Sequence, residues 1–224
     1  MGLAGRPLAA ILLSLIGLSS PANAETEIDR AVARFYVRET GGVGSPRFIY
    51  QRELAFEARL EALAEGEPRP GEPAYRPRHV RAAFDRHVTE TVLESLGIDP
   101  EPSAADIGRR VDEARLALIE RVHGVLPLRE AAQAEGIAET ELLRVLRRQA
   151  LASLYLDRMV APMLLPTESE LEAVHRTQRT PFSGRPFDEI EPALRRWVVE
   201  GRLSTALSAY YDGLRTRLVV TTLK

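Results

Sequence analysis

The chain has 224 residues, with 30 Lys and Arg against 32 Asp and Glu and a formal net charge of -2 at pH 7. This nearly balanced charge gives no electrostatic reason to expect nucleic-acid binding. The chain contains no cysteine, which excludes disulfides and cysteine catalysis, so the fold must be held by core burial. After residue 24 no apolar run approaches the length of a membrane span, and we expect no stable membrane anchor.

The first 24 residues are typical of a secretory signal peptide. One positive charge precedes an apolar core at residues 7–18, which is too short to span a bilayer. Ala22 and Ala24 are the small residues that signal peptidase requires, and Glu25 begins the polar chain. The pattern predicts cleavage after Ala24 and a periplasmic mature protein. A buried N-terminal helix is the alternative for this segment.

Strand-like segments are expected at both ends of the mature chain. Ala31–Val37 and Arg47–Gln51 are rich in β-branched and aromatic residues, and the Gly and Pro residues between them favour a turn. Leu218–Leu223 is β-branched and apolar, which predicts a short final strand. We expect the first and last strands to meet in one small sheet.

Helical periodicity covers most of the remaining length, which predicts a mainly α fold with a small terminal β-sheet. A Pro- and Gly-rich linker at residues 66–77 interrupts it. Ser103 with Asp106, and Thr167 with Glu170, have the pattern of helix N-caps. Helices are expected over Gln51–Ala64, Arg78–Leu96, Ser103–His123, Leu128–Glu135, Thr140–Val160, from Thr167 onward, and over Phe187–Arg217.

Residues with catalytic or metal-binding chemistry are not arranged in any recognised motif. The four histidines, His79, His87, His123 and His175, lack the spacing of helical zinc sites, so surface or capping positions are expected for them. No Gly-x-Ser-x-Gly motif is present. We therefore predict no catalytic residues, no metal and no cofactor. An enzyme remains an alternative, because catalytic groups can converge from distant parts of a chain.

Several short segments then occur in a characteristic order. The mature chain opens with Ile28–Ala33, a turn, Phe48–Tyr50 and Arg52-Glu53-Leu54 at the start of a helix. Later segments are Leu128–Gly136, Ile137, Thr140-Glu141-Leu142, Leu154–Val160, Pro166–Leu171, Phe187–Ile190, Leu214-Arg215 and Val219-Val220. In this order the chain resembles the N-terminal chaperone module of SurA-type periplasmic chaperones.

The resemblance implies one helical chaperone domain over residues 25–224. In isomerase-bearing relatives a parvulin domain of roughly a hundred residues, within the usual domain range, separates the last segments. Here only a short connection at residues 175–186 lies between them. The resemblance therefore implies chaperone function without prolyl isomerase activity.

The function expected from this resemblance is that of an ATP-independent holdase. Its partners would be unfolded or partly folded polypeptides, including outer-membrane proteins, whose unpaired strands aggregate in water. Aromatic and Met side chains suit such promiscuous contacts, although each could instead belong to the core. The candidates for client binding are Phe35, Tyr36, Phe48, Tyr50, Met159, Met163, Leu164, Leu165, Trp197, Tyr210 and Tyr211. A structural or adaptor protein that binds one defined envelope partner is the alternative from a different class.

Overall fold

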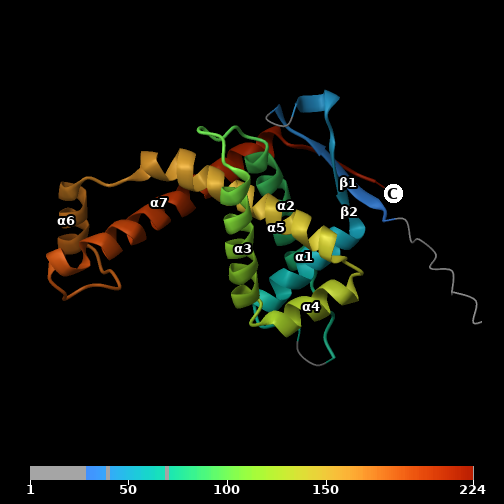
Figure 1. The fold of residues 1–224 in the computed structure, drawn as a ribbon, viewed down its shortest axis with the longest axis horizontal. Coiled ribbons are helices and arrows are strands. Elements are labelled where there is room, and N and C mark those ends of the chain that lie inside the picture. The colour runs from blue at the N-terminus through green and yellow to red at the C-terminus, as the bar shows by residue number, and fades with distance from the viewer. Residues whose placement is uncertain (1–28, 39–40, 69–70, 224) are drawn as a thin grey trace, which may run out of the picture.

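A computed structural model describes residues 29–38, 41–68 and 71–223 (Figure 1). The expected signal peptide and its cleavage residues, Ala22, Ala24 and Glu25, lie outside these residues, as does the side chain of Tyr211. The described chain is mainly helical, and its three strands form one antiparallel sheet.

The sheet joins the two ends of the described chain. Its strands are β1 (Ala31–Tyr36), β2 (Arg47–Tyr50) and β3 (Val219–Thr222), in the order β2-β1-β3. Ala33 pairs with Ile49 on one side and with Thr222 on the other. The expected meeting of the first and last strands is therefore confirmed, and Figure 1 shows β3 returning to β1 from the end of the last helix.

The helices follow the expected order, with small shifts at their ends. They are α1 (Gln51–Ala64), α2 (Pro77–Glu94), α3 (Ala104–Arg121), α4 (Val125–Ala134), α5 (Glu139–Tyr155), α6 (Glu168–Thr177) and α7 (Phe187–Arg217). The expected single helix to Val160 is wrong, because α5 ends at Tyr155 and continues as a π-helical turn, η3 (Leu156–Val160). A 3-10 turn, η4 (Ala161–Leu164), follows it, and another, η2 (Gly42–Gly44), lies between β1 and β2.

Side-chain caps fix the starts of α3 and α6, as expected. Ser103 Oγ accepts a hydrogen bond from the Asp106 backbone N–H at 3.1 Å, and an Asp106 carboxylate oxygen accepts one from the Ser103 N–H at 3.2 Å. Thr167 and Glu170 make the same reciprocal pair, at 3.3 Å and 2.8 Å. Each pair satisfies two backbone donors that the first turn of a helix leaves without intrahelical partners.

Three separate hydrophobic clusters stabilise the described chain. The first lies among α1, α3, α4 and α5 and includes Phe56 and Leu146. The second lies between the sheet and α2 and includes Phe35, whose side chain is fully buried. Phe35 was expected to contact clients; it is a core residue instead, because its face of β1 packs against α2. The third cluster lies between α6 and α7 and includes Leu171 and Leu194.

The third cluster gives the molecule an extended outline. We call the sheet with α1–α5 the body, and α6 with the adjoining part of α7, residues 168–198, the arm. Figure 1 shows the arm projecting from the body, with α6 at its outer end. Helix α7 is continuous from the arm to the sheet. It therefore belongs to both parts and links the arm directly to β3.

Candidate functional site

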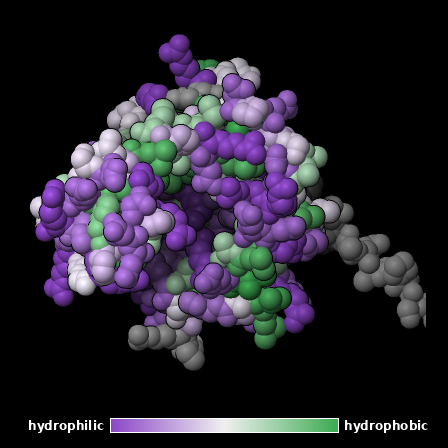
Figure 2. Space-filling model, turned by 60° about the vertical axis from the view of Figure 1, so that its left-hand side comes forward, coloured by the Kyte–Doolittle hydropathy of each residue, from purple (hydrophilic) through white to green (hydrophobic). Residues whose placement is uncertain are grey.

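The candidate site is a series of four adjoining surface cavities, which together we call the groove. The first and second cavities share Arg86, Glu90, Gln149 and Ser153 in their linings. The second and third share Leu93, Leu156 and Leu207, and the third and fourth share Ala206. Because neighbouring cavities have lining residues in common, the groove extends from the α2–α3–α5 side of the body to the arm. In Figure 2, with the arm side turned forward, the molecule has a central hollow bordered mainly by hydrophilic residues.

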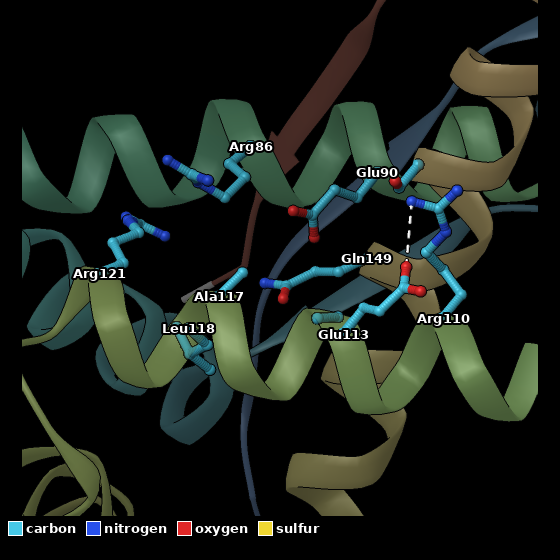
Figure 3. Close-up of a pocket in the computed structure, with 10 residues that line it drawn as sticks. Arg86, Glu90, Arg110, Glu113, Ala117, Leu118, Arg121 and Gln149 are labelled. Carbon is cyan, nitrogen blue, oxygen red and sulfur yellow. Dashed lines mark ion pairs between the residues drawn. The ribbon is translucent and has the colours of Figure 1, made fainter.

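The first cavity is the charged end of the groove. It has a volume of about 310 Å³ and lies among α2, α3 and α5. Figure 3 shows Arg86 and Glu90 from α2 facing Arg121 and Glu113 from α3 across this space, with Gln149 between them. The three arginines of this lining already have partners: Arg110 pairs with Glu113 at 3.4 Å, and Arg86 and Arg121 both pair with Glu61 of α1, at 2.8 Å and 2.6 Å. Groups of both charge signs therefore line this end, and it can offer them to a polar segment.

The second cavity, of about 420 Å³, connects this charged end to an apolar section. The third cavity, of about 220 Å³, is apolar apart from two tyrosine hydroxyls. Its lining is Leu93, Leu96, Tyr155, Leu156, Val160, Leu203, Ala206, Leu207 and Tyr210. The π-helical turn contributes Leu156 and Val160, and such turns are frequent at functional sites because they change the direction of the side chains that follow. This part of the groove can bury apolar side chains of a ligand.

The fourth cavity has the largest volume of the four, at about 710 Å³, and lies between the arm and η4. Its lining combines apolar groups, such as Trp197 and Leu164, with polar ones, such as Gln178 and Thr205. Gly201 leaves open space here, because nothing lies within 4 Å of where a Cβ would be. The cavity can therefore admit larger groups than the third.

Two arginines of α7 hold the segment that borders this cavity. Arg202 donates to the Leu164 carbonyl at 3.2 Å and to Glu170 at 3.0 Å. Arg195 donates to the Pro166 carbonyl at 3.0 Å. Leu165, which lies between these two carbonyls, is 56% exposed, and Met163, which directly precedes them, is 75% exposed. Large apolar side chains are thus presented to solvent at or beside an anchored segment.

A buried ion network lies beneath the groove and links α1, α2 and α5. The Arg148 guanidinium donates to Glu53 at 2.6 Å, to Glu90 at 3.2 Å and to Glu57. His87 Nδ1 lies 3.2 Å from the same Glu57 oxygen. Three carboxylates therefore share one guanidinium, an arrangement that favours retention of a proton within the cluster.

The pKa shifts of this network agree with its geometry. Burial raises the pKa of Glu57, but Arg148 and His87 outweigh that effect and hold the pKa below its usual range. For Glu90 burial dominates over the attraction of Arg148, the charge of Glu57 adds to it, and the pKa rises to about 7. Because Glu90 also lines the first two cavities, its charge at the groove surface changes near neutral pH.

Two groups of side chains bring one histidine and two carboxylates within reach of a single ion. They are Glu53, Glu57 and His87, and Glu65, Glu67 and His79. In the first group the Arg148 guanidinium already donates to both carboxylates. This group is therefore best explained as part of the buried ion network.

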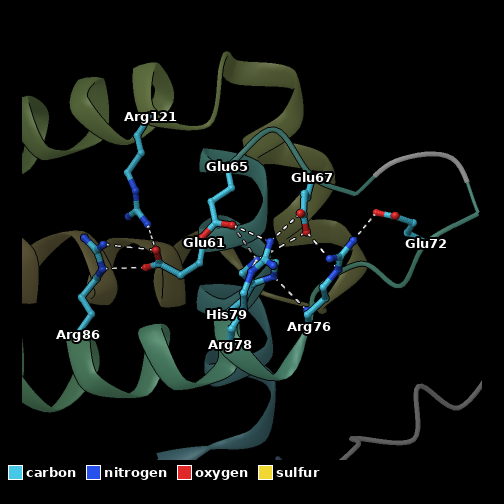
Figure 4. Close-up of polar contacts among 9 residues, drawn as sticks. All are labelled: Glu61, Glu65, Glu67, Glu72, Arg76, Arg78, His79, Arg86 and Arg121. Atoms are coloured by element: carbon cyan, nitrogen blue, oxygen red, sulfur yellow. Dashed lines mark hydrogen bonds and ion pairs between the residues drawn. The ribbon is translucent and has the colours of Figure 1, made fainter.

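The second group surrounds the start of α2 (Figure 4). His79 Nδ1 accepts a hydrogen bond from the Arg76 backbone N–H at 3.0 Å, and His79 Nε2 lies 3.0 Å from Arg78 Nε and 3.3 Å from a Glu65 carboxylate oxygen. A metal ion would have to displace Arg78, which contacts His79 and also pairs with Glu65 and Glu67. His79 is thus a helix cap, as expected, whereas His87 is a buried member of the Arg148 network rather than a surface residue.

The expected client-binding residues fall into distinct environments. Trp197, Tyr210 and Leu164 line the groove, and Met163 and Leu165 are exposed beside it. Met159 and Tyr36 are half-buried and line none of these four cavities. Phe48 and Tyr50 are 44% and 43% exposed on β2, away from the groove.

Sequence reasoning found Tyr210 but missed the rest of the apolar centre of the groove. Leu203, Ala206 and Leu207 line this section from α7 together with Tyr210. Their spacing of three and four residues marks an apolar helix face, which was available in the sequence. The sequence predicts a long helix here. It does not show that one part of this helix packs in the third hydrophobic cluster while a second apolar face, further along the helix, lines the groove.

In comparisons with known proteins, no family model, no curated protein and no solved structure matches this chain. Within the described residues, every helix is too short or too polar to cross a membrane.

Proposed function

We propose that this chain is an ATP-independent periplasmic chaperone, a holdase that binds unfolded envelope or outer-membrane proteins and has no prolyl isomerase activity. The observation that carries the proposal is the groove, whose lining changes from charged to apolar to mixed along its length. A site selective for one small molecule would more often be a single enclosed pocket with a few converging polar groups.

The groove suits extended segments of unfolded chains. Such segments alternate apolar and polar side chains when they are destined for β-barrels. The apolar third cavity can bury the former, while the charged first cavity can pair with the latter. Met163 and Leu165 beside the fourth cavity add exposed apolar area, which suits weak binding to many sequences because Met in particular adapts to different partners.

The SurA-type identity of the helical module and its export to the periplasm are parts of the same proposal. Two observations support the family resemblance: the order of the segments, and the pairing of β1 with β3 after a long last helix. The proposal of export rests on the pattern of residues 1–24.

The test is suppression of aggregation by the purified chain. Two unrelated denatured soluble proteins and one denatured outer-membrane protein are diluted from urea, and light scattering is followed with the chain at near-stoichiometric amounts. We expect scattering to fall for all three. Scattering equal to that of each denatured protein alone would refute the proposal. Tight one-to-one binding of a single envelope protein would instead favour the alternative function, that of a structural or adaptor protein.

A pair of substitutions on α7 locates the activity. Ala206→Arg places a long charged side chain at the junction of the third and fourth cavities. Ser208→Arg introduces the same side chain at an exposed position of the same helix that lines none of the groove cavities. We expect Ala206→Arg to lose most of the suppression and Ser208→Arg to keep it. Equal activity of the two variants would show that the groove is not the binding surface.

A further inference from the structure

Outside the groove, a fifth cavity of about 420 Å³ lies along β2, where the strand faces α1, α2 and α5. Arginines and aromatic residues dominate its lining. The lining is Pro46, Arg47, Phe48, Tyr50, Glu53, His87, Thr91, Glu94, Arg144, Arg147 and Arg148. Its volume falls in the range of small ligand pockets and is enough for one or two large side chains.

The rim of this cavity carries positive charge that the described chain leaves uncompensated. Within the described residues, Arg47 and Arg147 are exposed and have neither an ion pair nor a hydrogen-bond partner. Arg144 is 75% exposed at its side chain and reaches only Glu141, at 3.7 Å. Arg148 is already engaged by the Glu53 and Glu57 carboxylates. Against these three rim arginines, Glu94 is the one acidic group of the lining without a partner in the described part of the chain.

Aromatic surface lies beside these charges. Phe48 and Tyr50 are nearly half exposed, and as alternate residues of β2 they project on the same side of the strand. In the order β2-β1-β3 the outer edge of β2 has no strand partner among the described residues. An extended peptide can therefore meet backbone hydrogen-bonding groups, aromatic side chains and arginines along one strand.

We propose that this cavity binds an extended peptide segment in which a carboxylate lies next to a bulky apolar side chain. The carboxylate pairs with Arg47 and Arg147, since guanidinium groups bind carboxylates with two parallel hydrogen bonds. The apolar side chain packs on Phe48 and Tyr50. This inference rests on the proposed function, because it names one kind of client segment, and it adds a second contact region outside the groove.

Short fluorescent peptides test the inference by anisotropy. One peptide alternates Asp with Phe and Val, and its counterpart carries Asn at every Asp position. We expect the purified chain to bind the Asp peptide about tenfold more tightly, which corresponds to about 1.4 kcal/mol. The double variant Arg47→Glu/Arg147→Glu should lose this preference. Equal affinity of the two peptides for the unmodified chain, or a preference retained by the double variant, would overturn the inference.

The control variant is Arg129→Glu/Arg179→Glu, which makes the same change in net charge at exposed positions outside the fifth cavity. It should keep the tenfold preference; a matching loss would mean that net charge, rather than this cavity, attracts the peptide. Circular dichroism melting curves of both double variants exclude unfolding as a cause. Sodium acetate should not displace the Asp peptide relative to chloride at equal ionic strength, and full displacement would reassign the site to free anions.

The aggregation assay separates this inference from the proposed function. If the chain suppresses no aggregation but prefers the Asp peptide, and the double variant loses that preference, the proposed peptide site stands and the proposed holdase function fails. If the chain suppresses aggregation but shows no preference between the two peptides, only the proposed peptide site fails. A preference lost in Ala206→Arg but kept in Arg47→Glu/Arg147→Glu would place carboxylate recognition in the groove and overturn the inference.

Discussion

Replacement of Glu90 by Gln should change how the stability of the protein depends on pH. The Glu90 side chain is only 13% exposed, and its carboxylate lies 3.2 Å from Arg148 Nε. Arg148 is shared with Glu53 and Glu57, while Arg86 acts on Glu90 from its own helix. Burial is the largest effect and raises the pKa of Glu90 from 4.5 to about 7. Gln keeps the size and a hydrogen-bond acceptor for Arg148 but does not ionise.

The sign and size of the effect follow from linkage. A carboxyl with a raised pKa binds its proton more tightly in the folded state, so its contribution to stability is present at low pH and is lost as the pH rises through about 7. The full difference between 4.5 and about 7 corresponds to about 3 kcal/mol of unfolding free energy. Between pH 5 and pH 8, Glu90→Gln should therefore gain about 2 to 3 kcal/mol relative to the unmodified chain.

Urea unfolding at pH 5, 6, 7 and 8, followed by circular dichroism, measures this difference. Glu94→Gln on the same helix is the control, because Glu94 is exposed and outside the Arg148 network. Its unfolding free energy should follow that of the unmodified chain at every pH. Parallel pH profiles for Glu90→Gln and the unmodified chain would show that Glu90 ionises normally and would refute the argument from burial.

Three further substitutions test the core, the ion network and the arm. Phe35→Ala should lower the unfolding free energy by about 3 to 5 kcal/mol, because Phe35 is fully buried. Phe48→Ala, at an exposed position, should change it by less than about 1 kcal/mol. Equal losses of the two variants in urea titrations would contradict the assignment of Phe35 to the core. Arg148→Met should cost about 3 to 5 kcal/mol at pH 7, because the buried Glu57 and the partly buried Glu53 and Glu90 lose their shared partner. An unchanged urea midpoint would disprove that role. Thr167→Ala removes the cap of α6 and should speed hydrogen exchange in its first turn about fivefold, equivalent to about 1 kcal/mol, while Thr177→Ala at its last residue should not.

Features that depend on neighbouring residues were predictable from the sequence. The caps at Ser103 and Thr167 involve partners three residues away, so their patterns are visible locally. The strand character of both ends was also visible, because β-branched and aromatic residues are concentrated there. Pairing of β1 with β3 could be anticipated because both needed a partner and few other strands were available.

Apart from the pairing of β1 with β3, the features that depend on distant residues were not predictable. Glu57 and Arg148 are 91 residues apart, and no local pattern connects a glutamate in one helix to an arginine in another. Phe35 and Tyr36 are adjacent on β1, so they project to opposite faces of the sheet, and the sequence did not reveal which face α2 would cover. The π-helical turn after Tyr155 was also missed, since a turn with one extra residue disturbs the helical periodicity only slightly.

The path of α7 connects the groove to the sheet structurally. One end of this helix packs on α6 through Ile190 and Leu194, and its middle lines the groove. Near its other end, Tyr210 packs against the cluster beneath the sheet, and β3 follows directly and pairs with β1. The sheet therefore fixes the direction in which α7 leaves the body, and α7 sets the position of the arm beside η4. A client held in the groove would contact a helix whose position is fixed at one end by the arm cluster and at the other by the sheet, so the groove can stay open in the absence of a client.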